Sequence, residues 1–140
     1  MINSHYPPAH VVTNEAMRSC WAPDDGRTII HYMQPHTPIL ERGDSRDNVN
    51  VVGNNKSLPS MMRQYFNGKM SKQEIHELYM TNLRYVLDEV EILLENVDHN
   101  QAVLTSDHGE ALGEKNVWNH HPGLKMDAVR KVPWAEVSNV

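Results

Sequence analysis

The sequence predicts an α/β protein, in which a mostly parallel sheet is covered by packed helices. Two short apolar runs read as buried strands, Thr28–Met33, which is β-branched and aromatic, and Gln101–Ser106. Between them, apolar residues recur at helical spacing from Ser71 to about Asn96. A strand, a long helix and a second strand form a βαβ unit, so we expect the two strands to run parallel in one sheet.

The first helix and the long helix have recognisable starts. His10–Val12 is a candidate extended segment, after which Thr13 or Asn14 caps a helix that ends near Cys20. Ser71, three residues before a glutamate, begins the long helix with a capping box.

The remaining stretches are less regular. Ile39–Met70 is rich in Gly, Asn, Asp and Ser, and we expect a surface excursion or lid that holds one short helix around Leu58–Phe66. Val132–Val137 is a third candidate strand, and Pro133 near its start favours an edge position.

Length and composition narrow the function classes. The 140 residues suit a single domain over positions 1–140. The net charge of −5 comes with no Lys/Arg stripe, which excludes nucleic acid as an expected partner. No run of 18 apolar residues predicts a membrane span, and the polar start Met1–His10 predicts no signal peptide and hence a cytoplasmic protein. A single cysteine, Cys20, excludes an internal disulfide.

Histidine-bearing loops follow both strong strands. His36 follows the first strand, and Asp107 with His108 follows the second, while His120 lies about a dozen residues further on. Ligands bind at the carboxyl ends of parallel strands, so we expect these side chains to converge. Asp oxygen and neutral His nitrogen suit Zn²⁺, Mn²⁺ or Fe²⁺ better than Ca²⁺. Gly109 is expected to let the backbone turn sharply beside them.

Ordinary structural roles for these residues also stay open. Asp107 can cap a following helix on which His108 packs. His36, which lies between two prolines, and the pair His120–His121 can be ordinary residues of surface loops.

Two further candidates are set aside. Asp24–Asp25 precedes its strand, which places it at the opposite edge of the sheet, and a type I turn explains it. Cys20 has no histidine near it in the sequence, and a lone cysteine at a helix end is more often a small buried residue.

Three motifs together resemble one enzyme family. Asp107–Glu114, after a buried strand, resembles the TSDHGE-x-LGE signature of the sulfatase branch of the alkaline phosphatase superfamily. Tyr32–Pro38 is similar to the PHxP loop of that family, and Asn82–Val90 to its long helix. Val132–Trp134 resembles the strand that follows, so the match runs in order from about Val11.

The resemblance implies a partial alkaline-phosphatase-like fold and metal-dependent hydrolysis of sulfuric or phosphoric esters. By this resemblance Asp107 and His108 are ligands of a divalent metal ion, which is Zn, Mn, Ca or Mg. His36 contacts the anionic group or the leaving oxygen. His120 contacts the anion or, in phosphatase relatives, binds a second metal. The local sequence His120–His121–Pro122 differs from the usual Gly-His, so either histidine can face the site.

The sequence departs from the family at the nucleophile. The first metal-binding Asp is absent, and C-x-P-x-R does not occur, since Cys20–Pro23 places proline one position late and Arg27 is out of register. The chain therefore resembles the carboxyl-terminal part of the catalytic domain alone. Three functions stay open: a sulfatase-type hydrolase, of which the chain is a piece or which a partner chain completes, a non-catalytic metal- or anion-binding module, and a remnant without ligand. The expected partners are the ester substrate and either a chain that supplies the missing half or further copies of this chain in a homo-oligomer. For such a part we expect an exposed apolar surface that favours association.

Overall fold

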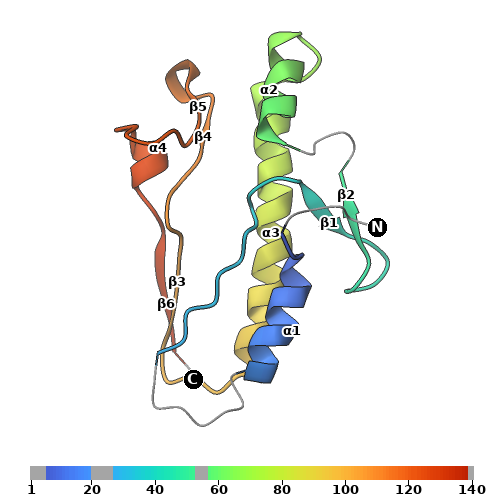
Figure 1. Cartoon of the computed structure of the whole chain (residues 1–140), viewed down its shortest axis with the longest axis vertical. Coiled ribbons are helices and arrows are strands. Elements are labelled where there is room, and N and C mark those ends of the chain that lie inside the picture. The colour runs from blue at the N-terminus through green and yellow to red at the C-terminus, as the bar shows by residue number, and fades with distance from the viewer. Residues whose placement is uncertain (1–5, 20–26, 53–56, 139–140) are drawn as a thin grey trace. The chain divides into compact units, whose positions relative to one another are not determined.

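A computed structural model of the chain describes residues 6–19, 27–52 and 57–138 (Figure 1). The chain divides into two compact units, Met1–Val97 and Asp98–Val140. The prediction of one domain over positions 1–140 stays a prediction. Within the described ranges, no helix is both long enough and apolar enough to cross a membrane.

Two helices pack together in the first unit. Helix α1 (Ala9–Ser19) lies beside α3 (Lys72–Asn96), although the two are far apart in sequence (Figure 1). The capping box predicted for α3 is confirmed, because Ser71 Oγ accepts from Glu74 N–H and the Glu74 carboxylate accepts from Ser71 N–H. The buried face of α3 includes two polar side chains among its apolar ones: Ile75, Asn82, Tyr85, Val86, Glu89, Val90 and Leu93.

The predicted excursion contains regular structure. Strands β1 (Leu40–Arg42) and β2 (Val49–Val51) form an antiparallel hairpin, and β1 contacts α3. Helix α2 (Leu58–Phe66) confirms the short helix predicted there, and the Ser57 side chain caps it by accepting from Ser60 N–H. The role of residues 39–70 as a lid stays a prediction.

The second unit is built from two small antiparallel pairs. Strand β3 (Ala102–Thr105) pairs with β6 (Trp134–Val137), and β4 (Ala111–Leu112) pairs with β5 (Trp118–Asn119). A 3₁₀ turn, η1 (Glu114–Asn116), joins β4 to β5, and a short helix, α4 (Asp127–Arg130), precedes β6. Among the described residues of this unit, Ala111, Leu112, Trp118 and Val129 are the buried apolar ones.

The prediction of a mostly parallel α/β sheet is wrong. The sheets of the described residues are two-stranded and antiparallel, and no parallel pair is among them. Thr28–Met33 forms no strand, and Ile29 within it is 93% exposed. A strand needs a hydrogen-bonded neighbour, and β-propensity records only the fit of a side chain to such a surface. The strand predicted at Gln101–Ser106 is confirmed as β3, but its neighbour is β6.

The long helix consequently packs on other elements than a parallel sheet. Among the described elements, it packs mainly against α1 and β1. Leu83, one of the apolar residues at helical spacing, is only half-buried, and its neighbour in sequence Asn82 is fully buried instead. The partial alkaline-phosphatase-like fold expected from the resemblance is therefore not what the described residues form.

The first helix starts earlier than its capping residues suggested. It begins at Ala9, because the Pro8 carbonyl accepts a hydrogen bond from Val11 N–H at 3.0 Å, so His10–Val12 is helical rather than extended. Cys20 and the pair Asp24–Asp25 lie outside the described residues.

Candidate functional site

Asp107 and His108 follow β3 directly, in the loop that leads to β4. One oxygen of Asp107, Oδ1, accepts a hydrogen bond from His108 N–H at 3.0 Å. The other, Oδ2, lies 3.7 Å from His108 Nε2. The two side chains are 69% and 40% exposed, respectively, so an ion can reach both. This local turn brings a carboxylate oxygen and an imidazole nitrogen to the same side of the loop.

The hydrogen bond of the His108 ring determines which nitrogen is available for a metal ion. His108 Nδ1–H donates to the Gly109 carbonyl at 2.9 Å, and in this tautomer Nε2 carries the lone pair. Metal-binding histidines commonly use their second ring nitrogen in this way. Two ligands of a tetrahedral zinc ion lie about 3.4 Å apart, close to the distance between Asp107 Oδ2 and His108 Nε2. The donor pair therefore fits two ligands of one divalent ion.

A complete metal centre is not formed by these side chains alone. Within residues 6–19, 27–52 and 57–138, no group of three or more His, Cys, Asp or Glu side chains could hold a metal ion. A catalytic zinc site usually takes three ligands from protein. Asp107 and His108 thus supply part of a coordination shell, and the remaining ligands must come from water, a bound anion or other protein residues.

His120 lies against His108. Their ring centroids are 4.1 Å apart, and the ring planes are tilted by 34°. His120 Nδ1–H donates to Glu110 Oε2 at 2.8 Å. His121, the alternative candidate, is exposed. Among the histidines left open by the sequence, it is His120 that the structure brings to the Asp107–His108 loop.

The β4–β5 hairpin explains why Glu110 and His120 meet. In the antiparallel register Ala111 faces Asn119 and Leu112 faces Trp118, so the next residues outward are Glu110 and His120. Side chains that flank each other in this way across two strands interact directly.

Asn119 adjusts the approach of His120. Its φ of 72° is in the left-handed region, which asparagine tolerates better than most residues, and its side-chain oxygen accepts from His120 N–H at 2.9 Å. A local backbone conformation therefore orients the residue that follows β5.

Gly109 serves a different purpose from the sharp turn that we predicted. The backbone of Gly109 does not have the positive φ that such a turn would use. Instead, its N–H donates to the Val129 carbonyl at 2.8 Å, and a Cβ at this position would lie 2.1 Å from the Ala128 carbonyl oxygen. The glycine is needed because α4 approaches the loop too closely for any side chain.

His36 belongs to the first unit. It is exposed, its ring Nδ1–H donates to the Thr37 carbonyl at 2.8 Å, and its ring edge meets Tyr6 at a centroid distance of 5.8 Å. The predicted convergence of His36 with Asp107 stays a prediction, since the two residues belong to different units.

The side chain of Asn82 holds the loop that carries His36 by hydrogen bonds. Its Oδ1 accepts from Leu40 N–H at 3.1 Å, and its Nδ2 donates to the carbonyls of Pro35, His36 and Pro38 at 2.9, 3.1 and 3.3 Å. The side chain is fully buried. Buried backbone N–H and C=O groups require hydrogen-bond partners, and the side-chain amide of Asn82 supplies them to the loop and to the start of β1.

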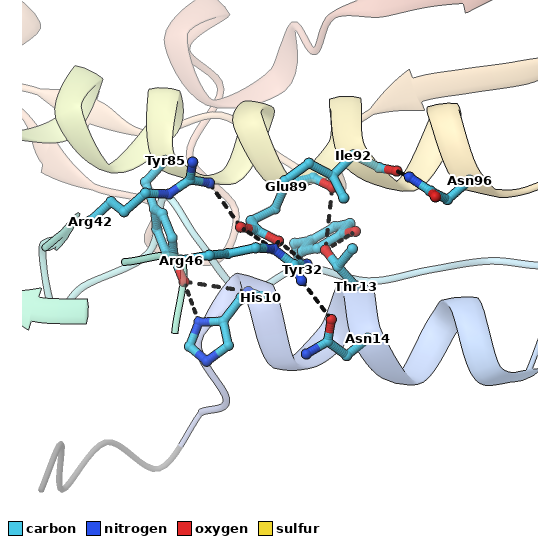
Figure 2. A network of polar contacts seen from close by, with 10 residues as sticks. All are labelled: His10, Thr13, Asn14, Tyr32, Arg42, Arg46, Tyr85, Glu89, Ile92 and Asn96. Atoms are coloured by element: carbon cyan, nitrogen blue, oxygen red, sulfur yellow. Dashed lines mark hydrogen bonds and ion pairs between the residues drawn. The ribbon is translucent and has the colours of Figure 1, made fainter. Parts of the chain in front are cut away.

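A second buried polar cluster, on the same helix, is shown in Figure 2. Glu89 is fully buried and accepts from Arg42 at 2.8 Å and from Arg46 at 2.6 Å, and Arg46 also donates to Asn14 Oδ1. The hydrogen bond to Glu89 raises the pKa of Arg46 above its ordinary value. Because both arginines come from the β1–β2 hairpin and its loop, the cluster joins hairpin, α3 and α1.

Two tyrosines extend this cluster. Tyr32 hydroxyl donates to Thr13 Oγ1 at 2.9 Å, and Tyr85 hydroxyl lies 3.1 Å from His10 Nδ1 (Figure 2). Burial raises the pKa of Tyr32 and the pKa of Tyr85. The buried side chains of Glu89, Thr13 and Tyr85 each bond to another element of the first unit, which is typical of a structural network.

Sequence reasoning missed Glu110, Asn82 and Glu89. Glu110 was noticed only as part of the DHGE string, and its partner His120 depends on a hairpin with strands of two residues, too short to give a pattern. Asn82 and Glu89 do have a weak signal, because both fall on the apolar face of α3 at helical spacing. A polar residue on such a face needs a buried partner.

Comparison of the chain with protein-family models, with curated proteins and with solved structures finds no match. The resemblance to the sulfatase branch therefore depends on the quoted motifs.

Proposed function

We propose that this chain carries the metal- and anion-binding part of a sulfatase-type hydrolase of sulfuric or phosphoric esters. The observation that supports this most directly is the Asp107–His108 pair, with Oδ2 and Nε2 3.7 Å apart and His108 Nδ1–H bound to a backbone carbonyl. Asp107 and His108 are the metal ligands in this proposal. The support comes from these motif residues, and none of it from the sheet topology.

Each of the four residues has its own role in the proposed reaction. A divalent ion bound by Asp107 and His108 supplies Lewis-acid stabilisation of negative charge on the ester. His120, which lies against His108, contacts the anionic group, and His36 contacts the anion or the leaving oxygen. Sulfate and phosphate esters are equally acceptable here, because both present a tetrahedral oxyanion to the same kinds of group.

The nucleophile comes from outside the motifs quoted above, since C-x-P-x-R does not occur in the 140 residues. A partner chain or another part of the same assembly would provide it. The second candidate function is a non-catalytic metal- or anion-binding module. It is favoured by the finding that the described side chains contain no group of three or more His, Cys, Asp or Glu that could hold a metal ion.

The test is anion binding to the purified chain, with inorganic sulfate and phosphate as probes and Mn²⁺ or Zn²⁺ present or absent. We expect either anion to bind only with metal, and Asp107→Ala to abolish that binding. Hydrolysis of aryl sulfate and aryl phosphate is measured in parallel, and negligible turnover is expected, because loss of a nucleophile costs several powers of ten in rate. Anion binding that ignores metal would contradict the hydrolase proposal and would leave only the anion-binding module, and robust metal-dependent turnover would show that a nucleophile is present in the chain.

A further inference from the structure

The turn between α2 and α3 combines positive charge with an exposed aromatic ring, in a chain whose net charge is −5. Residues 48–73 contain no Asp or Glu. Phe66, the last residue of α2, is 69% exposed. Three basic residues of the same segment lie around this turn, and together with Phe66 we call them the α2–α3 surface: Arg63, Lys69 and Lys72.

Backbone hydrogen bonds fix the course of the chain at this surface. Gly68 N–H donates to the Tyr65 carbonyl at 2.9 Å, and Lys69 N–H donates to the Gln64 carbonyl at 2.8 Å. The two bonds form a Schellman motif, in which Gly68 takes the left-handed position with a φ of 67°. The chain therefore turns back directly after Phe66, so that Lys69 lies beside the end of α2 before α3 begins (Figure 1).

The aromatic side chains at this end of α2 contact each other and a lysine. The rings of Tyr65 and Phe66 meet edge to face at a centroid distance of 5.3 Å, and Lys72 Nζ lies 5.8 Å from the centroid of the Tyr65 ring. These contacts limit the freedom of the exposed Phe66 ring. Less ordering entropy is then lost when a partner binds it.

The positive charges of this surface are open to a partner. In the part of the chain that the structure describes, the ion pairs of Lys and Arg with acidic side chains involve neither Arg63 nor Lys69. Both of these side chains are exposed. The first carboxylate that follows in the sequence, Glu74, accepts from Ser71 N–H and Ser71 Oγ–H at the start of α3.

An anionic lipid surface matches both features at once. Basic side chains are attracted to anionic headgroups, and an aromatic ring beside them enters the boundary between headgroups and acyl chains. An acidic peptide would neutralise the cations, but it would leave the Phe66 ring in water. The pairing of exposed cations with an exposed apolar ring therefore favours the lipid surface.

We propose that the α2–α3 surface docks the chain on an anionic bilayer, with Phe66 at the boundary of the acyl chains and the basic side chains on the headgroups. The docking is weak and reversible, because one ring and a few charges bury little apolar surface. It is independent of the metal- and anion-binding function proposed above, since it uses other residues.

Co-sedimentation of the full chain with vesicles tests the docking. One set contains phosphatidylserine and phosphatidylcholine in equal amounts, the other contains phosphatidylcholine alone, and EDTA removes any contribution of metal. We expect binding to the anionic vesicles only. Raising NaCl from about 0.1 M to about 1 M shortens the screening length from about 10 Å to about 3 Å and should release the chain. Equal binding to both sets, or binding to neither, would overturn the proposal.

Two variants with matched controls locate the surface. Lys69→Ala should lower the vesicle partition coefficient about fivefold, the equivalent of about 1 kcal/mol for a basic residue near an anionic surface. Phe66→Ser should lower it about tenfold, because the ring then no longer leaves water. The controls are Lys125→Ala, at an exposed lysine of the second unit, and Leu87→Ser, at an exposed apolar side chain of α3, and both should bind as the wild-type chain does.

Two results of the variant series would contradict the docking surface. Equal losses in Lys69→Ala and Lys125→Ala would mean that the net charge alone governs binding, and would overturn the proposal. Binding of the wild-type chain to soluble polyglutamate but not to the anionic vesicles would make an acidic protein the partner, and would overturn it as well.

Discussion

Arg46 and Glu89 form a bidentate ion pair in which the carboxylate is fully buried. Arg46 Nη2 lies 2.6 Å from Glu89 Oε2, and Arg46 Nε lies 3.1 Å from both carboxylate oxygens. Planar pairing of this kind fixes geometry as well as charge. Since Arg46 lies between β1 and β2 and Glu89 on α3, the pair anchors the hairpin to the long helix.

Removing Arg46 should lower the free energy of unfolding more than removing an exposed charge does. Arg46→Ala leaves the buried Glu89 with Arg42 as its remaining guanidinium, and we expect a loss of about 3 kcal/mol in the free energy of unfolding. Glu91→Gln, an exposed change on the same helix, is the control. Urea unfolding measures both, and equal effects of the two substitutions would show that the ion pair does not hold the hairpin.

Stability should fall at alkaline pH through Tyr32 and Tyr85. Burial raises the pKa of both hydroxyls, so the folded chain favours their neutral form. An unfolded tyrosine ionises near about pH 10, so this contribution is complete below that pH and is lost as pH rises through the higher folded pKa. Unfolding midpoints measured across this range, together with tyrosinate absorbance of the native chain, test this.

The matched variants for this prediction are Tyr32→Phe and Tyr85→Phe. Each should remove part of the late-ionising absorbance and flatten the alkaline loss of stability. An alkaline profile that is the same in both variants as in the wild-type chain would contradict the prediction.

Asn82 should be among the most sensitive positions of α3. Asn82→Ala leaves Leu40 N–H and the loop carbonyls without their partner, which should lower the free energy of unfolding by about 3 kcal/mol. Asn96→Ala is the control, because that side chain is exposed and bonds the Ile92 carbonyl of its own helix. Faster hydrogen exchange at His36 N–H in the Asn82 variant, but not in the control, would locate the effect in the loop.

The long helix was predictable because its signals are local. The capping box spans Ser71–Glu74, and the apolar spacing repeats from Ile75 to Leu93, over about five turns. The strand β3 and the short helix α2 were likewise visible in a few adjacent residues.

The partners of these elements were not predictable in the same way. Thr28–Met33 has the composition of a buried strand, yet strand pairing depends on residues far away in sequence, and β3 pairs with β6 instead. At the candidate site, the string Asp107–His108 was visible, whereas the contact of Glu110 with His120 follows from hairpin register. Local elements could be predicted from the sequence, and the distant residues that become their neighbours could not.

Gly109→Ala should disrupt the candidate site by steric overlap. The new Cβ would lie 2.1 Å from the Ala128 carbonyl oxygen, so the loop or α4 must move, and we expect a loss of about 2 kcal/mol with weaker Mn²⁺ binding. Gly123→Ala is the control. An alanine at its φ of 82° carries a backbone strain of about 1 kcal/mol, but the new Cβ would meet no atom within 4 Å apart from its chain neighbours. Unimpaired Mn²⁺ binding by the Gly109 variant would mean that the loop does not hold the metal.

Pulsed electron paramagnetic resonance of Mn²⁺ bound to the full chain tests the proposed metal site most directly. Coupling of the manganese electron spin to a histidine nitrogen is expected in the wild-type chain, because in the proposed site one ion is shared by His108 Nε2 and Asp107 Oδ2, which lie 3.7 Å apart. The coupling should disappear in His108→Ala, and Asp107→Ala should abolish binding. Mn²⁺ that binds without nitrogen coupling, or coupling that survives in His108→Ala, would contradict the proposed site.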